Sequence, residues 1–191
     1  MSFEFSRRNF MKYTAVAAVA LAGASLFTGC KNSGDSYNLM CNGAGELTVL
    51  QVTAAMGNYV EKDKKYTAPE LTGTTIEFPM KITNNRTNPI YVNPTNFKAV
   101  VYNKENKVIK KCNFYNGGIE FDENAGLYET NLTKGSSVSG KIKVNIGTAL
   151  TEGQYIVLTY CPDLQYNEYS LNWKLTVPKK ESSASTTSTT T

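Results

Sequence analysis

The side chains in this chain that are best suited to chemistry are four cysteines: Cys30, Cys41, Cys112 and Cys161. The 191-residue sequence contains no histidine, which excludes a Ser-His-Asp triad, a Cys-His dyad and a histidine-ligated zinc site. The cysteines form no CxxC pair, so the spacing typical of a structural zinc site is missing as well. We therefore expect no catalytic residue, metal or cofactor, and we expect the cysteines to serve anchoring or structure.

Cys30 follows a segment with the order of a secretory signal. Residues 1–12 are polar and basic, residues 13–27 are apolar and uncharged, and the chain becomes polar after Cys30. The apolar part is shorter than the roughly 20 residues that a membrane-spanning helix needs. The head contains Ser-Arg-Arg-Asn-Phe-Met-Lys, which resembles the twin-arginine export motif through Arg7 and Arg8. General secretion is the alternative route, since paired arginines also occur by chance.

The end of this signal resembles the lipobox of bacterial lipoproteins. Its residues are Thr28-Gly29-Cys30, in which a small residue precedes the cysteine whose sulfur receives a diacylglycerol. We expect residues 1–29 to be cleaved and Cys30 to hold the mature chain on the cell membrane, facing outside the cytoplasm. The rival expectation is a freely secreted chain, because residues 22–24 read Ala-Gly-Ala and fit a signal-peptidase site.

The other three cysteines leave several pairings open, because their number is odd. A disulfide between Cys112 and Cys161 would leave Cys41 outside the pair. Cys41 could instead bond either of them and pin the start of the chain to the fold. All three would stay reduced if the chain folds before export.

A candidate binding loop follows Cys161. The segment 161–169 joins two strong strand patterns, is too polar to be buried, and carries Leu164, Tyr166 and Tyr169. Tyrosine offers a rigid apolar surface with a polar tip, which suits a protein partner or a glycan. Ordinary packing is the alternative role for most of the twelve tyrosines in the chain.

The charged residues indicate no specific partner. A net charge of +4 is too small to argue for nucleic acid. The acidic cluster Glu120, Asp122 and Glu123 lacks the order of a calcium loop, and we expect it to be solvated. The short basic runs 62–65 and 110–111 are likewise expected on solvated faces.

The elements that must position these residues are β-strands. Apolar residues alternate with polar ones over 76–83, 138–146 and 171–177, and this period of two is typical of half-buried strands. Further strands are expected at 47–54, 97–102, 107–110, 127–131 and 155–161, separated by Asn-, Gly- and Pro-containing turns. Seven to nine strands at this spacing predict a single antiparallel immunoglobulin-like sandwich. Pro79 within a strand predicts an edge or a bulge there.

The composition divides the mature chain into three parts. Residues 30–45 are predicted to be the lipidated cysteine and a flexible tether, since they contain few apolar side chains. Residues 46–178 are predicted to be the sandwich. Residues 179–191 are rich in Ser and Thr and are predicted to be a disordered tail.

Several strand-and-turn runs carry a family resemblance. The runs at 75–85, 89–92, 97–103 and 132–144 together resemble the uncharacterised immunoglobulin-like domains of bacterial lipoproteins that are related to the mycobacterial immunoprotective extracellular antigen. The resemblance implies an immunoglobulin-like sandwich outside the cell, and it implies no activity, because the family has no general one.

These observations favour a non-catalytic binding module at the cell envelope, anchored through diacylglyceryl-Cys30 and contacting an envelope or extracellular protein or glycan. A structural or accessory subunit of an envelope assembly is the alternative. A hydrolase of envelope polymers is disfavoured, because histidine, a G-x-S-x-G elbow and a recognisable carboxylate pair are all missing from the sequence.

Overall fold

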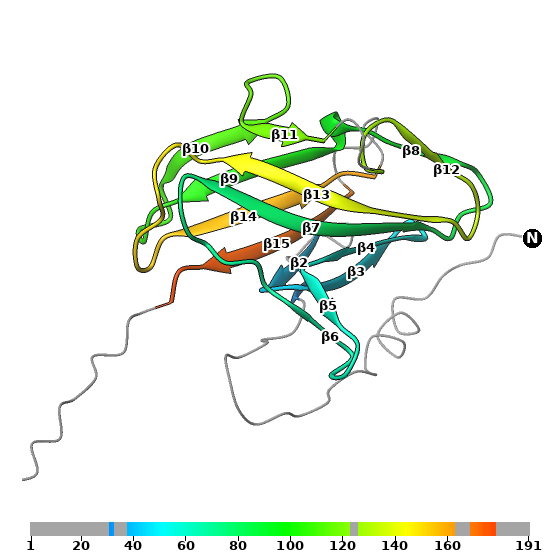
Figure 1. Ribbon diagram of the computed structural model, residues 1–191, viewed down its shortest axis with the longest axis horizontal. Helices are drawn as coiled ribbons and strands as arrows, with labels where there is room; N and C mark the ends of the chain where they lie inside the picture. Colours follow the sequence, from blue (N-terminus) through cyan, green and yellow to red (C-terminus); the bar gives the residue numbers. More distant parts are fainter. Residues whose placement is uncertain (1–30, 33–37, 123–125, 163–168, 179–191) are drawn as a thin grey trace, which may run out of the picture.

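The computed structural model describes residues 31–32, 38–122, 126–162 and 169–178. These residues form two β-sheets that pack face to face, so the predicted all-β sandwich is confirmed. Figure 1 shows β7 and β13 crossing over β9, β14 and β15. Several predictions lie outside the described residues, namely the signal peptide with Arg7 and Arg8, Cys30, and the tail 179–191.

The first sheet has six strands and the second has five. The six-stranded sheet consists, in order, of β1 (Lys31–Asn32), β2 (Asn38–Asn42), β15 (Ser170–Thr176), β14 (Tyr155–Tyr160), β9 (Phe97–Tyr102) and β10 (Val108–Asn113). The five-stranded sheet consists, in order, of β11 (Ile119–Phe121), β13 (Ser137–Asn145), β7 (Thr75–Asn84), β4 (Val52–Met56) and β3 (Gly45–Val49). Two small ribbons complete the fold: β8 (Ile90–Val92) with β12 (Thr130–Leu132), and β5 (Asn58–Val60) with β6 (Lys65–Thr67).

The topology is that of an immunoglobulin-like sandwich. Such a sandwich places strands A, B, E and D in one sheet and C, F and G in the other. Here β4, β7, β13 and β11 are neighbours in that order, and they face β9, β14 and β15. Taken in chain order, these strands are A, B, C, D, E, F and G, with β10 as the additional strand C′.

The alternating patterns build the core between the sheets. On β7 every second side chain from Ile76 to Ile82 is buried, while Glu77 and Lys81 are exposed. Trp173 on β15 is fully buried, and it lies on the apolar side of the alternating segment 171–177. Its Nε1 donates a hydrogen bond of 3.0 Å to the carbonyl oxygen of Gly45 on β3, so it connects the two sheets.

The sheets hold more strands than predicted, and one pair is parallel. Their eleven strands exceed the expected seven to nine, chiefly because the predicted tether is partly sheet. β2 pairs in parallel with the last strand, β15, and Cys41 within it is buried. Residues 38–45 are therefore part of the sandwich. The tether prediction was wrong there because the order of this polar segment comes from pairing with a distant strand.

A hairpin replaces the single strand predicted over residues 47–54. β3 and β4 are joined by Leu50 and Gln51, whose φ angles are 51° and 57°. Two positive φ angles are typical of a type I′ turn, which normally uses Asn or Gly. The sequence carries neither there, so the turn could not be seen. The predicted strands 107–110 and 127–131 also shift, to β10 and β12.

Pro79 does not lie on an edge strand, because β7 is the central strand of its sheet. β7 pairs with β13 from Thr75 to Thr83, but it pairs with β4 only from Met80 onward. The Pro79 carbonyl accepts a hydrogen bond of 2.9 Å from the Gly57 amide, just where β4 ends. The amide hydrogen that proline lacks would point to this same side, where the pairing with β4 ends, so the pairing of β7 with β13 is not interrupted.

Candidate functional site

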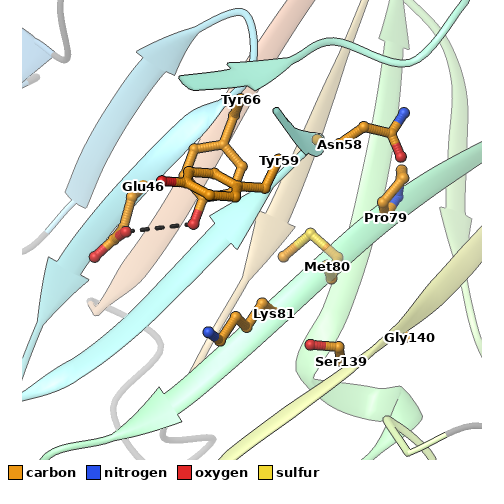
Figure 2. Close-up of a pocket in the computed structure, with 10 residues that line it drawn as sticks. Glu46, Asn58, Tyr59, Tyr66, Pro79, Met80, Lys81, Ser139 and Gly140 are labelled. Carbon is orange, nitrogen blue, oxygen red and sulfur yellow. Dashed lines mark hydrogen bonds between the residues drawn. The ribbon is translucent and has the colours of Figure 1, made fainter. Parts of the chain in front are cut away.

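A pocket of about 540 Å³ lies on the outer face of the five-stranded sheet, beside the β5–β6 hairpin (Figure 2). It is lined by ten residues: Glu46, Gly57, Asn58, Tyr59, Tyr66, Pro79, Met80, Lys81, Ser139 and Gly140. They come from the hairpin and from β3, β7 and β13. Segments far apart in the sequence thus meet in one polar and aromatic hollow.

The hairpin stands beside the sheet because Gly57 turns the chain away from β4. Its φ angle is 112°, a conformation that side chains with a Cβ rarely adopt. A Cβ at this position would lie 2.5 Å from the Thr67 carbonyl oxygen and 2.6 Å from the Ala44 Cβ. Only glycine allows β6 to approach this closely, so Gly57 fixes the hairpin that forms one wall of the pocket.

Three of the lining residues, Glu46, Lys81 and Ser139, lie in one row that crosses four strands. Glu46 pairs with Ala55, Ala55 with Lys81, and Lys81 with Ser139. Side chains directly opposite each other share a face, and this row faces away from the core. Glu46 and Lys81 are two strands apart, or about 10 Å. Ala55 between them is only 3% exposed, so its outward side is covered.

The aromatic wall is a cross-strand tyrosine pair. Tyr59 and Tyr66 are directly opposite each other on the hairpin, with ring centroids 5.1 Å apart and ring planes at 56°. The Tyr66 hydroxyl donates to Glu46 Oε2 at 3.4 Å, and Tyr59 is 50% exposed. Burial, followed by the nearby charge of Glu46, raises the pKa of Tyr66 above its ordinary value of 10.0. Tyr66 is therefore a neutral donor at neutral pH.

The pocket offers recognition chemistry from several sides. It combines two aromatic rings, one carboxylate, one ammonium group, the Asn58 amide and the Ser139 hydroxyl (Figure 2). Aromatic faces bind the apolar face of a ring, and the polar groups around them can hydrogen-bond to its hydroxyls or amides. Glu46 is the one carboxylate among the ten lining residues.

The loop predicted to bind is not part of this pocket. Leu164 and Tyr166 lie outside the described residues. Tyr169, at the end of that loop, is half-buried and packs against the hydrophobic core.

Cys112 and Cys161 are both buried thiols, and the disulfide between them, one of the pairings that the sequence left open, is not formed. Cys112 is paired with Ala99, which is paired with Leu158, and Cys161 is three residues beyond Leu158. Two strand spacings and three residues along the strand separate the cysteines by about 14 Å. A disulfide requires Cα atoms within about 7 Å, so the register excludes this bond.

Cys41 is at the far end of the same row. It pairs with Trp173, which pairs with Leu158, so it is four strands away from Cys112. The register also excludes bonds from Cys41 to the other two cysteines. Burial raises the pKa of the Cys112 and Cys161 thiols, and this keeps both in the unreactive protonated form.

Sequence reasoning treated the tyrosines only as a group and did not predict the pocket that Tyr59 and Tyr66 form. The usable signal was the pair of short runs Asn58-Tyr59-Val60 and 65–67 around a polar turn. That turn was interpreted only as a basic run. It ends at Lys64, whose φ angle of 49° again occurs without glycine.

Comparison with known protein families identifies an export signal near the start of the chain. A family model for the twin-arginine translocation pathway signal sequence matches residues 4–24, which include Arg7 and Arg8. The predicted twin-arginine motif is thereby confirmed. Comparison with curated proteins gives no match. In the ranges that the structure describes, no helix has the length and apolarity needed to span a bilayer.

Three solved structures are similar to the chain at low identity. The yjhA protein of Bacillus subtilis is 10% identical, with 70% of this chain and 98% of that chain covered and a TM-score of 0.44. A candidate lipoprotein, ycdA, of the same organism is 13% identical, with 71% and 39% covered and a TM-score of 0.41. A family 123 glycoside hydrolase of Clostridium perfringens is 14% identical, with 67% and 27% covered and a TM-score of 0.40. The match to the export signal shows that this chain is an exported protein.

Proposed function

We propose that the chain is a lipid-anchored, non-catalytic binding module of the cell envelope and that the pocket beside the β5–β6 hairpin binds an envelope glycan. The anchor is a diacylglycerol on Cys30, supported by the lipobox-like Thr28-Gly29-Cys30 that follows the export signal. The observation that carries the binding role is the pocket itself, in which two tyrosine rings stand beside separated acidic, basic and amide groups.

The composition of the pocket favours binding over hydrolysis. Hydrolysis of a glycosidic bond ordinarily uses a pair of carboxylates at a fixed separation. The lining residues supply Glu46 alone, and its Oε2 already accepts the Tyr66 hydrogen bond. This contact orients the Glu46 carboxylate toward the tyrosine wall, which suits a binding surface.

The experiment is co-sedimentation of the purified protein with insoluble peptidoglycan sacculi. We expect Tyr59→Ala to weaken binding about tenfold, since a stacked aromatic contact contributes about 1–1.5 kcal/mol. Tyr91→Ala is the matched control, because Tyr91 on β8 is 52% exposed and lies outside the pocket. We expect it to bind like the wild type.

Two outcomes would contradict this proposal. Wild-type protein that stays in the supernatant would remove peptidoglycan as the ligand. Equal losses for Tyr59→Ala and Tyr91→Ala would show that general surface aromaticity, and not the pocket, produces the binding. Circular dichroism of each variant confirms that the sandwich remains folded.

A further inference from the structure

The outer face of the six-stranded sheet carries charge of one sign. β9, β10, β14 and β15 are described along their whole lengths, and they contain four lysines and no aspartate or glutamate. Three of these lysines, Lys98, Lys111 and Lys174, lie on the face that points away from the core. Lys110 points elsewhere, since its Nζ lies near Gly147 at the β13–β14 connection.

The strand register places two of these lysines in one row. Lys174 pairs with Val157, Val157 with Val100, and Val100 with Lys111. This row therefore has a lysine at each end and two half-buried valines between them. Lys98 lies on the same face, two residues from Val100.

The next row on this face is aromatic. Tyr155 pairs with Tyr102, which pairs with the half-exposed Val108. The two rings are stacked, with centroids 4.8 Å apart and planes at 12°, and Lys174 Nζ lies 4.0 Å from the Tyr155 ring centroid. Lysines around tyrosine and valine side chains form an amphipathic cationic surface, which suits a lipid–water interface.

The opposite face of the sandwich differs. On the five-stranded sheet, Glu77 and Lys141 form an ion pair of 2.9 Å, and Glu46 and Lys81 lie in one row. Acidic and basic groups thus alternate there. Lysines without acidic neighbours on the same strands are therefore concentrated on the outer face of the six-stranded sheet, which is the face away from the pocket.

The course of the chain places the anchor at the edge of the cationic sheet. β1 begins at Lys31, the residue next to Cys30, and Lys31 pairs with Met40 of β2. β1 and β2 belong to the six-stranded sheet. An acyl chain on Cys30 would therefore be attached one residue from this sheet, which keeps the domain close to the membrane.

We propose that the outer face of the six-stranded sheet, with Lys98, Lys111 and Lys174, lies against the anionic lipid headgroups of the membrane that holds the anchor. This rests on the anchoring in the proposed function. A lipid anchor and a basic surface are the two signals that together give stable membrane attachment. Because the two outer faces of a sandwich point in opposite directions, the glycan pocket then faces away from the membrane.

The test is lysine footprinting of the lipidated protein in vesicles. The protein is reconstituted in two kinds of vesicle, one of phosphatidylcholine alone and one that also contains about 30% phosphatidylglycerol. The exposed lysines are then acetylated briefly, and the extent of acetylation at each lysine is measured by mass spectrometry. We expect acetylation of Lys98 and Lys111 to fall at least about threefold in the anionic vesicles and to recover in about 0.5 M NaCl, which screens exposed charges. Lys81 and Lys141 on the opposite face serve as internal controls, and their labelling should not change.

Each outcome decides a different point. Equal labelling of Lys98 and Lys111 in both vesicles would overturn the membrane-facing surface and leave the anchor intact. Protein that fails to stay with either vesicle would remove the anchor and this surface together. In a third arm with native membranes that contain protein, protection of Lys98 and Lys111 that neither vesicle gives would indicate an acidic protein partner, and the lipid assignment would be wrong. None of these results depends on glycan binding, which the sacculus experiment measures.

Discussion

Trp173→Ala should lower the free energy of unfolding by about 3–5 kcal/mol, the range for removing a large aromatic side chain from a packed core. Trp173 has the largest of the fully buried side chains, and it lies between the two sheets. The substitution would leave a cavity and would also leave the Gly45 carbonyl without its hydrogen bond of 3.0 Å. Urea unfolding followed by circular dichroism measures the change.

Trp173→Phe separates the two contributions. It retains an aromatic ring in the core and removes the Nε1 donor, so we expect a smaller loss of about 1–3 kcal/mol. If the alanine variant is as stable as the phenylalanine variant, the cavity has little effect and the packing between the sheets differs from the structure described here.

Gly57→Ala should strongly weaken binding at the pocket while most of the sandwich stays folded. The added Cβ would meet the Thr67 carbonyl at 2.5 Å, so β6 must move and the Tyr59–Tyr66 wall moves with it. We expect at least a tenfold loss of sacculus binding and a destabilisation of about 1–3 kcal/mol from the strained backbone.

Gly73→Ala is the matched control for this change. Gly73 also has a positive φ angle, 75°, but a Cβ there would meet nothing within 4 Å. Gly73→Ala therefore has the conformational cost of a positive φ angle but no steric clash. We expect its glycan binding to stay close to that of the wild type. Normal binding by Gly57→Ala would show that the hairpin position does not define the pocket.

The strands with strict alternation could be predicted from the sequence. The predicted strands 97–102 and 155–161 match β9 and β14 within one residue, and β7, β13 and β15 are equally close. Each has a buried and an exposed face, and this produces a period of two. Burial of Trp173 followed from the same pattern.

The errors occurred where tertiary contacts determine the local structure. β2 is a polar segment whose order depends on Asn172: the Asn172 Nδ2 donates to Asn38 Oδ1 and, at 3.0 Å, to the Leu39 carbonyl. Asn172 is more than a hundred residues further along the chain, so no local pattern could reveal this pairing. The turn at Leu50 and Gln51 has positive φ angles without the residues that normally indicate them.

The pocket was missed for a related reason. Tyr59 and Tyr66 are brought together by a hairpin that begins at Gly57, and Glu46 reaches them only because β3 lies beside β4. Alternation identifies which side of a strand faces outward, but it does not show which outward residues meet. The register of the five-stranded sheet supplies that information.

The measurement that most directly tests the account is the intact mass and detergent partitioning of the protein made in a bacterial host, with wild type beside Cys30→Ala. We expect wild-type protein to begin at Cys30, to carry the added mass of acyl chains and to enter the detergent phase. We expect Cys30→Ala to carry no acyl mass and to stay in the aqueous phase. If both proteins are aqueous and begin at Ser25, the chain is secreted freely, and the membrane-anchored account is wrong.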